Sequence, residues 1–81
     1  MMKKPEAFDY DGFFIYENRK ISYRITDNYK SIKNEKMSRF INFFENKENL
    51  GVYAIYGDVE EMTNITSEDA KKWFDKYIKN K

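Results

Sequence analysis

The single leucine of this chain, Leu50, limits how the protein can build a hydrophobic core. Phe, Tyr and Trp make up 19% of the 81 residues. Each such ring can bury on the order of 150–250 Å². The core must therefore consist mainly of aromatic rings and isoleucines. A chain of this length forms one domain that buries only roughly 60% of its unfolded surface, so we expect modest stability.

Two missing residue types exclude several kinds of chemistry. The chain has no histidine and no cysteine, which excludes disulfides and thiolate metal sites and removes the usual general base and zinc ligand. No Ser or Thr has a His partner that would activate it as a nucleophile. We therefore expect a protein that is not an enzyme and that carries neither a metal nor a cofactor.

Charge and hydropathy bear on partners and location. The 15 basic and 14 acidic residues give a net charge of +1, whereas proteins that neutralise phosphates usually have a clear basic excess. No apolar run approaches the ~18 residues that a membrane-spanning helix needs. The first residues are basic but lack the apolar segment of a signal peptide. We expect a cytoplasmic protein with no membrane partner.

The N-terminal third of the chain predicts a flexible arm followed by a hairpin. Residues 1–8 lack periodicity, which leaves one domain at residues 9–81. Residues 12–17 (GFFIYE) and 21–26 (ISYRIT) are typical of β-strands. We favour a two-residue loop at Asn18-Arg19, because it groups five apolar side chains on one face. These five are Phe14, Tyr16, Ile21, Tyr23 and Ile25.

The register of the hairpin decides which side chains face solvent. In the favoured register Tyr16 lies opposite Ile21, and the second face carries Phe13, Ile15, Ser22 and Arg24. A three-residue loop would instead move Phe13 and Ile15 to the face of Tyr23 and Ile25. Both registers remain open at this point.

The rest of the chain predicts two helices and one or two further strands. Four apolar residues at helical spacing, Met37, Phe40, Ile41 and Phe44, indicate a helix over about 31–48. Residues 51–56 (GVYAIY) predict a third strand, and residues 59–65 predict a fourth after a turn at Gly57-Asp58.

The clearest predicted element is the C-terminal helix. Thr66 and Asp69 have the spacing of a capping box, and an apolar stripe that includes Trp73 and Phe74 follows. The order ββαβ(β)α predicts an α+β domain, with a small antiparallel sheet of three or four strands and two amphipathic helices packed on it. Phe40 and Trp73 are expected to face the core.

One predicted sheet face is left uncovered. Both faces of the hairpin carry apolar side chains, and two helices on one side of a sheet cover one face only. Exposed apolar side chains next to basic ones are typical of a protein-interaction surface. The predicted partner-binding residues are Phe13, Ile15, Arg19, Lys20 and Arg24. The competing interpretation is that the N-terminal arm folds back and places Phe8 or Tyr10 over Phe13.

The function expected from this surface is that of a small non-enzymatic module that binds a protein and acts as an adaptor or inhibitor. The size and the abundance of Lys, Asn, Ile, Tyr and Phe, which suggests an AT-rich coding sequence, suit a phage or mobile-element accessory protein that inhibits a host defence complex. The alternative is a sequence-tolerant nucleic-acid binder that uses Phe13, Arg19, Lys20 and Arg24. A homodimer is a further expectation, with Phe13, Ile15 and either Tyr53 or Ile55 on the shared uncovered face.

Overall fold

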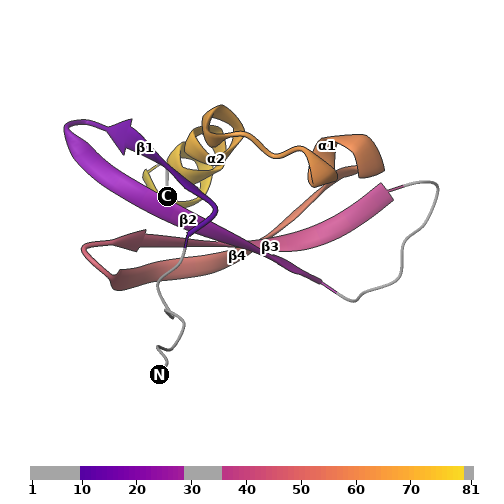
Figure 1. Ribbon diagram of the computed structural model, residues 1–81, viewed down its shortest axis with the longest axis horizontal. Coiled ribbons are helices and arrows are strands. Elements are labelled where there is room, and N and C mark those ends of the chain that lie inside the picture. The colour runs from indigo at the N-terminus through magenta and orange to yellow at the C-terminus, as the bar shows by residue number, and fades with distance from the viewer. Residues whose placement is uncertain (1–9, 29–35, 80–81) are drawn as a thin grey trace, which may run out of the picture.

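Four strands in chain order form one antiparallel sheet (Figure 1). A computed structural model describes residues 10–28 and 36–79. The strands are β1 (Gly12–Tyr16), β2 (Arg19–Asp27), β3 (Lys36–Glu45) and β4 (Glu48–Asp58). The helices α1 (Val59–Thr63) and α2 (Ser67–Phe74) follow, and α2 continues as the π-helical turn η1 (Asp75–Lys79). The predicted α+β class with an antiparallel sheet and helices is confirmed, although all four strands precede the helices. The predicted arm at 1–8 lies outside the described residues.

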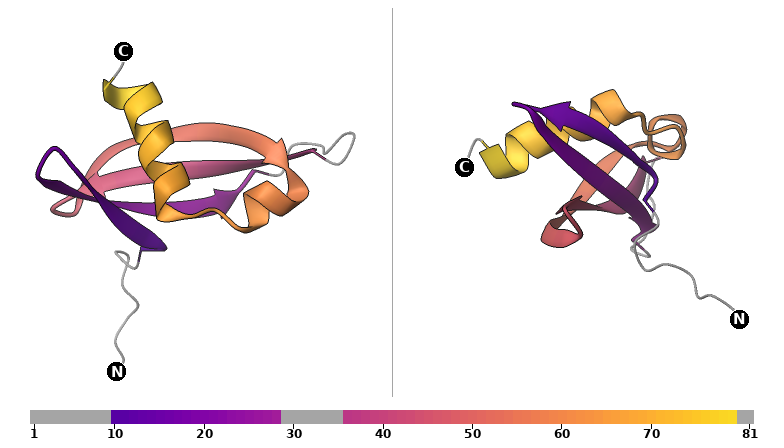
Figure 2. Two further views of the ribbon diagram at one scale, coloured as in Figure 1. Left: turned by 90° about the horizontal axis from the view of Figure 1, so that it is seen from above. Right: turned by 60° about the vertical axis from the view of Figure 1, so that its left-hand side comes forward.

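The sheet has one covered face and one uncovered face. In Figure 2, α2 lies across the strands on one side of the sheet, and α1 lies on that same side. We call this side the inner face and the opposite side the outer face. Because successive strand residues point to opposite faces, the register assigns every side chain to one of the two.

The first hairpin turns one residue earlier than predicted. Tyr16 pairs with Arg19, so the loop is Glu17-Asn18, and both loop residues have the positive φ of a primed two-residue turn (51° and 68°). Ile21 therefore pairs with Phe14, two residues from the expected Tyr16. A shift by two leaves each side chain on its face, so the predicted division of the hairpin into two faces is correct.

The helix predicted over 31–48 is wrong, because Lys36–Glu45 is the strand β3. The second loop, Asn46-Lys47, also has positive φ at both residues (53° and 69°) and joins β3 to β4 in a hairpin. The apolar spacing resembled a helical stripe because β3 is covered on both faces at one end. Phe43 is buried on the inner face, and Phe44 is buried on the outer face under the ring of Tyr10, at 5.1 Å between centroids.

The strand predicted at 59–65 is also wrong, since Val59–Thr63 forms the helix α1. Asp58 lies at its N-cap, and the Glu61 carboxylate accepts a hydrogen bond from the Asp58 backbone N–H at 3.4 Å. The single apolar residue in the middle of this segment, Met62, is fully buried. Within this charged segment only Met62 is buried. A short helix makes its backbone hydrogen bonds internally, whereas an edge strand would leave half of them unmade.

The C-terminal helix begins as predicted. The Thr66 hydroxyl accepts a hydrogen bond from Asp69 N–H at 3.1 Å, and the Asp69 carboxylate accepts one from Thr66 N–H at 3.1 Å. This capping box sets the start of α2 over the sheet. The Tyr23 hydroxyl lies 3.2 Å from the Ser67 hydroxyl, which joins the first turn of α2 to the centre of β2.

The core lies between α2 and the inner face. Its fully buried large side chains are Ile21, Ile41, Phe43, Ile55, Met62 and Phe74. The Phe74 ring contacts the rings of Phe14, Tyr16 and Phe43, with centroids 5.5, 5.1 and 5.2 Å away. Two residues that the sequence predicts in the core are not fully buried there. Trp73 is only partly buried against the core, and Phe40 lies partly exposed on the outer face opposite Ala54.

Candidate protein-interaction surface

Four large apolar side chains stand half exposed on the outer face. Phe13 and Ile15, on the edge strand β1, are 52% and 53% exposed. Val52 and Tyr56, on the opposite edge strand β4, are 53% and 64% exposed. We call these the β1 pair and the β4 pair. They lie on the outer face because Phe14 and Ile55, their neighbours in sequence, are buried against the helices.

Lys20 lies beside the β1 pair. It lies opposite Ile15 on β2, and its Nζ atom is 4.7 Å from the centroid of the Phe13 ring. This is a cation–π contact. The structure therefore brings together three of the five predicted site residues, and the ammonium group lies over an exposed ring where a partner would meet both.

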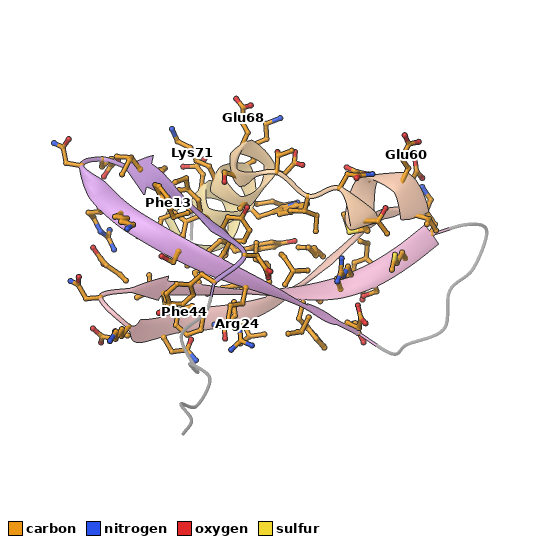
Figure 3. The ribbon with its side chains drawn as sticks, viewed as in Figure 1. Phe13, Arg24, Phe44, Glu60, Glu68 and Lys71 are labelled. Atoms are coloured by element: carbon orange, nitrogen blue, oxygen red, sulfur yellow. The ribbon has the colours of Figure 1, made fainter. Side chains whose placement is uncertain are left out.

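Arg24 shares the outer face but lies further along β2. It is partly buried opposite Asn42 on β3, four residues from Lys20, or roughly 13 Å at the rise of a strand. In Figure 3, Arg24 and Phe44 lie on the side of the sheet away from Glu68 and Lys71 of α2. Phe13 pairs with Ser22, so Arg24 is its diagonal neighbour and borders the β1 pair.

Arg19 is not brought to this surface. It lies opposite Tyr16 and forms a two-pronged ion pair with Glu45, with Nε–Oε2 at 3.0 Å and Nη2–Oε1 at 2.7 Å. The hydrogen bond from Arg19 lowers the pKa of Glu45 below its ordinary 4.5, and the same contact raises the pKa of Arg19. Arg19 therefore fastens β2 to the end of β3, and the alternative role in nucleic-acid binding loses one of its cations.

The outer face of the four described strands has a basic excess. Its charged side chains are Lys20, Arg24, Lys36 and Asp58. The two at the far end neutralise each other, since Lys36 Nζ lies 2.9 Å from Asp58 Oδ1. The helices on the other side carry acidic first turns, with Glu60 and Glu61 on α1 and Glu68 and Asp69 on α2. Over the four described strands, the outer face thus carries two more basic than acidic side chains.

The competing interpretation placed Phe8 or Tyr10 over Phe13. Tyr10 packs on Phe44, whereas Phe13 stays half exposed beside it; Phe8 lies outside the described residues. Tyr10 therefore covers the β3 part of the outer face and leaves the β1 pair open.

Sequence reasoning missed the β4 pair. It placed Tyr53 or Ile55 on the uncovered face, but Ile55 is buried inward and the Tyr53 ring stacks on Tyr77 at 5.1 Å between centroids. The alternating residues of GVYAIY (51–56) divide into two faces of a strand, but the sequence alone does not show which face the helices cover. That assignment needed the register against β3, which had been interpreted as a helix.

Arg39 is a further charged residue whose contacts the structure defines. On the inner face its Nη1 donates to the Met62 carbonyl at 2.9 Å, and its Nη2 lies 3.1 Å from the Asp27 carboxylate. These contacts hold α1 against β3. Arg39 is therefore explained by the fold.

Within residues 10–28 and 36–79, no group of three or more Asp, Glu, His or Cys side chains is arranged to hold a metal ion. None of the described helices has the length and apolar character needed to cross a bilayer. The chain matches no protein-family model, no curated protein and no solved structure. The functional argument therefore depends on the outer face itself.

Proposed function

We propose that this protein is a small non-enzymatic module that binds another protein through the β1 pair and Lys20. The observation that carries the proposal is the half-exposed Phe13 and Ile15 on an edge strand, with the Lys20 ammonium group over the Phe13 ring. Single exposed apolar residues are common on any protein. Aromatic residues are enriched at protein interfaces, and here a branched aliphatic side chain lies beside the ring on the same exposed surface.

The partner that suits this surface has an apolar pocket bordered by acidic residues. Lys20 and Arg24 on the same face would meet that acidic border and steer association, so the association rate should fall as salt rises. A module of this kind acts by occupying a surface of its partner, as an adaptor or an inhibitor does. The small size and the AT-rich coding composition support a role as an inhibitor of a host defence complex, carried by a phage or mobile element.

Affinity capture from the native cell, followed by mass spectrometry, tests the proposal. Phe13→Glu should lose the captured protein while its melting temperature stays close to that of the wild type, because Phe13 is outside the core. Val59→Glu is the matched control, since Val59 is also an exposed apolar residue (42%) but lies on α1. Capture that survives both Phe13→Glu and Ile15→Glu would show that the β1 pair is not the binding surface.

The second candidate function is sequence-tolerant binding of single-stranded nucleic acid, favoured by the Lys20–Phe13 contact. Two cations on the face, Lys20 and Arg24, would give a salt dependence of only about 1.4 log units in affinity per log unit of salt, at roughly 0.7 per phosphate contact. Gel-shift titration at low salt separates the two functions. Micromolar binding with a slope near this value, lost in Lys20→Ala and Arg24→Ala, would favour nucleic acid over a protein partner.

A further inference from the structure

The strand β4 exposes a row of backbone groups at the edge of the sheet. In the described sheet it pairs with β3 alone over its 11 residues. The Tyr77 hydroxyl donates to the Ala54 carbonyl at 3.4 Å, so this carbonyl points away from β3. Alternate residues of an antiparallel strand direct their N–H and C=O groups to the same side. Val52 and Tyr56, two residues to either side of Ala54, therefore also point their backbone groups outward.

This edge lacks the features that usually prevent strands from pairing. Residues 49–57 contain no charged residue and no proline. Natural edge strands commonly carry such residues or are covered by another element. The other edge strand, β1, has only five residues and lies against the C-terminal helix, where the Tyr16 hydroxyl bonds to Asp75. The C-terminal helix also reaches β4, at the Tyr77–Ala54 contact, but β4 is the longer of the two edges and has an uncharged central stretch, so it is the one suited to receive a further strand.

We propose that β4 pairs antiparallel with β4 of a second copy of this chain, about a two-fold axis at Ala54. Val52 then faces Tyr56 of the second copy, Ala54 faces Ala54, and Tyr56 faces Val52. Each of these three facing pairs exchanges two hydrogen bonds, about six in all. The Ala54 carbonyl has two lone pairs, so it can accept from the second copy and keep the Tyr77 contact.

The side chains of the β4 pair complement each other in this register. Val52 and Tyr56 are 53% and 64% exposed on the outer face, and the axis at Ala54 places each against the other across the interface, twice. Aromatic and β-branched side chains in directly facing positions stabilise a strand pair. An axis at Tyr53 would instead place Tyr56 opposite Leu50, and an axis at Ile55 would place it opposite Ala54. The Ala54 axis is the one that joins the two exposed side chains.

The charges permit this pairing. Asp58 would lie opposite the apolar Leu50 of the second copy, and its own charge is matched by Lys36 at 2.9 Å. No like charges face each other over residues 50–58. A contact made by one strand of each copy should bury less than the roughly 800 Å² per partner of a standard interface. We therefore expect a dimer that dissociates in the micromolar range.

Pairing by β4 creates one eight-stranded sheet with both outer faces on the same side. The two β1 pairs then lie at its ends, separated by seven strand spacings, or roughly 33 Å. The inference does not depend on the proposed partner, because the β1 pair takes no part in the β4 contact.

Single cysteines test the register directly, because the chain has none of its own. Facing residues that exchange hydrogen bonds have Cα atoms about 5.5 Å apart, within the range that a disulfide spans. Ala54→Cys should therefore form a disulfide dimer under mild oxidation. Val52→Cys is the matched control, since its two copies would lie roughly 14 Å apart across the axis and stay monomeric. Equal cross-linking of both variants, or of neither, would overturn the proposed pairing.

Sedimentation over a range of concentrations gives a second readout without cysteines. The wild type should pass from monomer to dimer through the micromolar range, and Tyr56→Lys should raise the dissociation constant at least about tenfold. The control, Ile15→Lys, also replaces an exposed apolar side chain of the outer face by Lys, but on the edge strand β1. It should leave the dissociation constant of the dimer within about twofold of the wild type. A wild type that stays monomeric at high micromolar concentration, or a dimer weakened by Ile15→Lys and not by Tyr56→Lys, would contradict the proposal. Loss of partner capture with the dimer intact would instead concern only the β1 pair.

Discussion

The Tyr16 hydroxyl at the end of β1 donates a hydrogen bond to the carboxylate of Asp75, which is 59 residues away in sequence at the end of α2. This contact closes the helix over the edge of the sheet that the first strand forms. The hydrogen bond to Asp75, then burial, then the repulsion between Asp75 and a phenolate raise the pKa of Tyr16 from 10.0 to about 12.

The Tyr16 contact predicts a loss of stability at high pH. The folded protein holds this proton more tightly than the unfolded chain, so the contribution is fully present below pH 10 and is lost as pH rises through about 12. Urea unfolding of wild type and Tyr16→Phe across this window measures it. The difference between them should shrink as pH rises, and Tyr56→Phe on the other face controls for the loss of a phenol. A difference that stays constant would show that Asp75 does not hold the proton.

The Arg19–Glu45 ion pair predicts the opposite trend in acid. Because the pKa of Glu45 lies below its ordinary 4.5, the stabilisation is present above pH 4.5 and is lost as pH falls through the lowered pKa. Thermal melts from neutral to acid pH should show less acid sensitivity in Glu45→Gln than in the wild type. Arg19→Gln should reproduce the effect of Glu45→Gln, and unequal acid profiles of the two variants would count against the pair.

Neighbouring phenylalanines of β3 should respond differently to truncation. Phe43→Ala removes a fully buried ring and should cost roughly 3–5 kcal/mol. Phe40→Ala removes a partly exposed ring from the outer face and should cost clearly less, because water already reaches the site. Urea unfolding compares the two. Equal costs would mean that β3 does not present alternate faces as described.

Gly12 lies beneath the ring of Tyr23, to which it is paired. A Cβ atom at Gly12 would lie 2.5 Å from Tyr23 Oη and 2.8 Å from Cζ. The ring is buried, with its hydroxyl at Ser67, so we expect Gly12→Ala to cost roughly 1–3 kcal/mol of unfolding free energy. In a Tyr23→Leu background the same substitution should cost much less. A cost that does not depend on Tyr23 would assign the need for glycine to the backbone instead.

The sequence predicts those parts of this fold that are decided locally. The capping box of Thr66 and Asp69 marks the start of α2 without any tertiary contact. The alternation in the first hairpin survives an error of one residue in the turn, because the pairing moved by two and kept both faces.

The parts that failed are those decided by distant residues. Phe44 is buried on the outer face, where the ring of Tyr10 packs on it, so β3 lacks the alternation that identifies a strand. That error hid the second hairpin, and with it the orientation of β4 and the exposed Val52 and Tyr56. The β1 pair was found because its strand could be assigned from its own hairpin. The hairpin register separates Arg19 from that pair, because Arg19 lies opposite Tyr16, but its ion pair with Glu45, a residue of the missed strand, could not be expected.

The four strands lie in the sheet in the same order as in the chain, which affects how the protein folds while it is being synthesised on the ribosome. The loops β1–β2 and β3–β4 have two residues each, and eight residues separate β2 from β3, so the meander can form as it emerges, with little loop-closure entropy to overcome. The helix that covers the inner face is made afterwards. At about 5–20 residues per second, the stretch from Glu45 to Phe74 takes roughly 1–6 s to translate. For those seconds the nascent chain carries Ile21, Ile41 and Phe43 on a bare apolar sheet, which is the stage at which a holding chaperone would decide its yield.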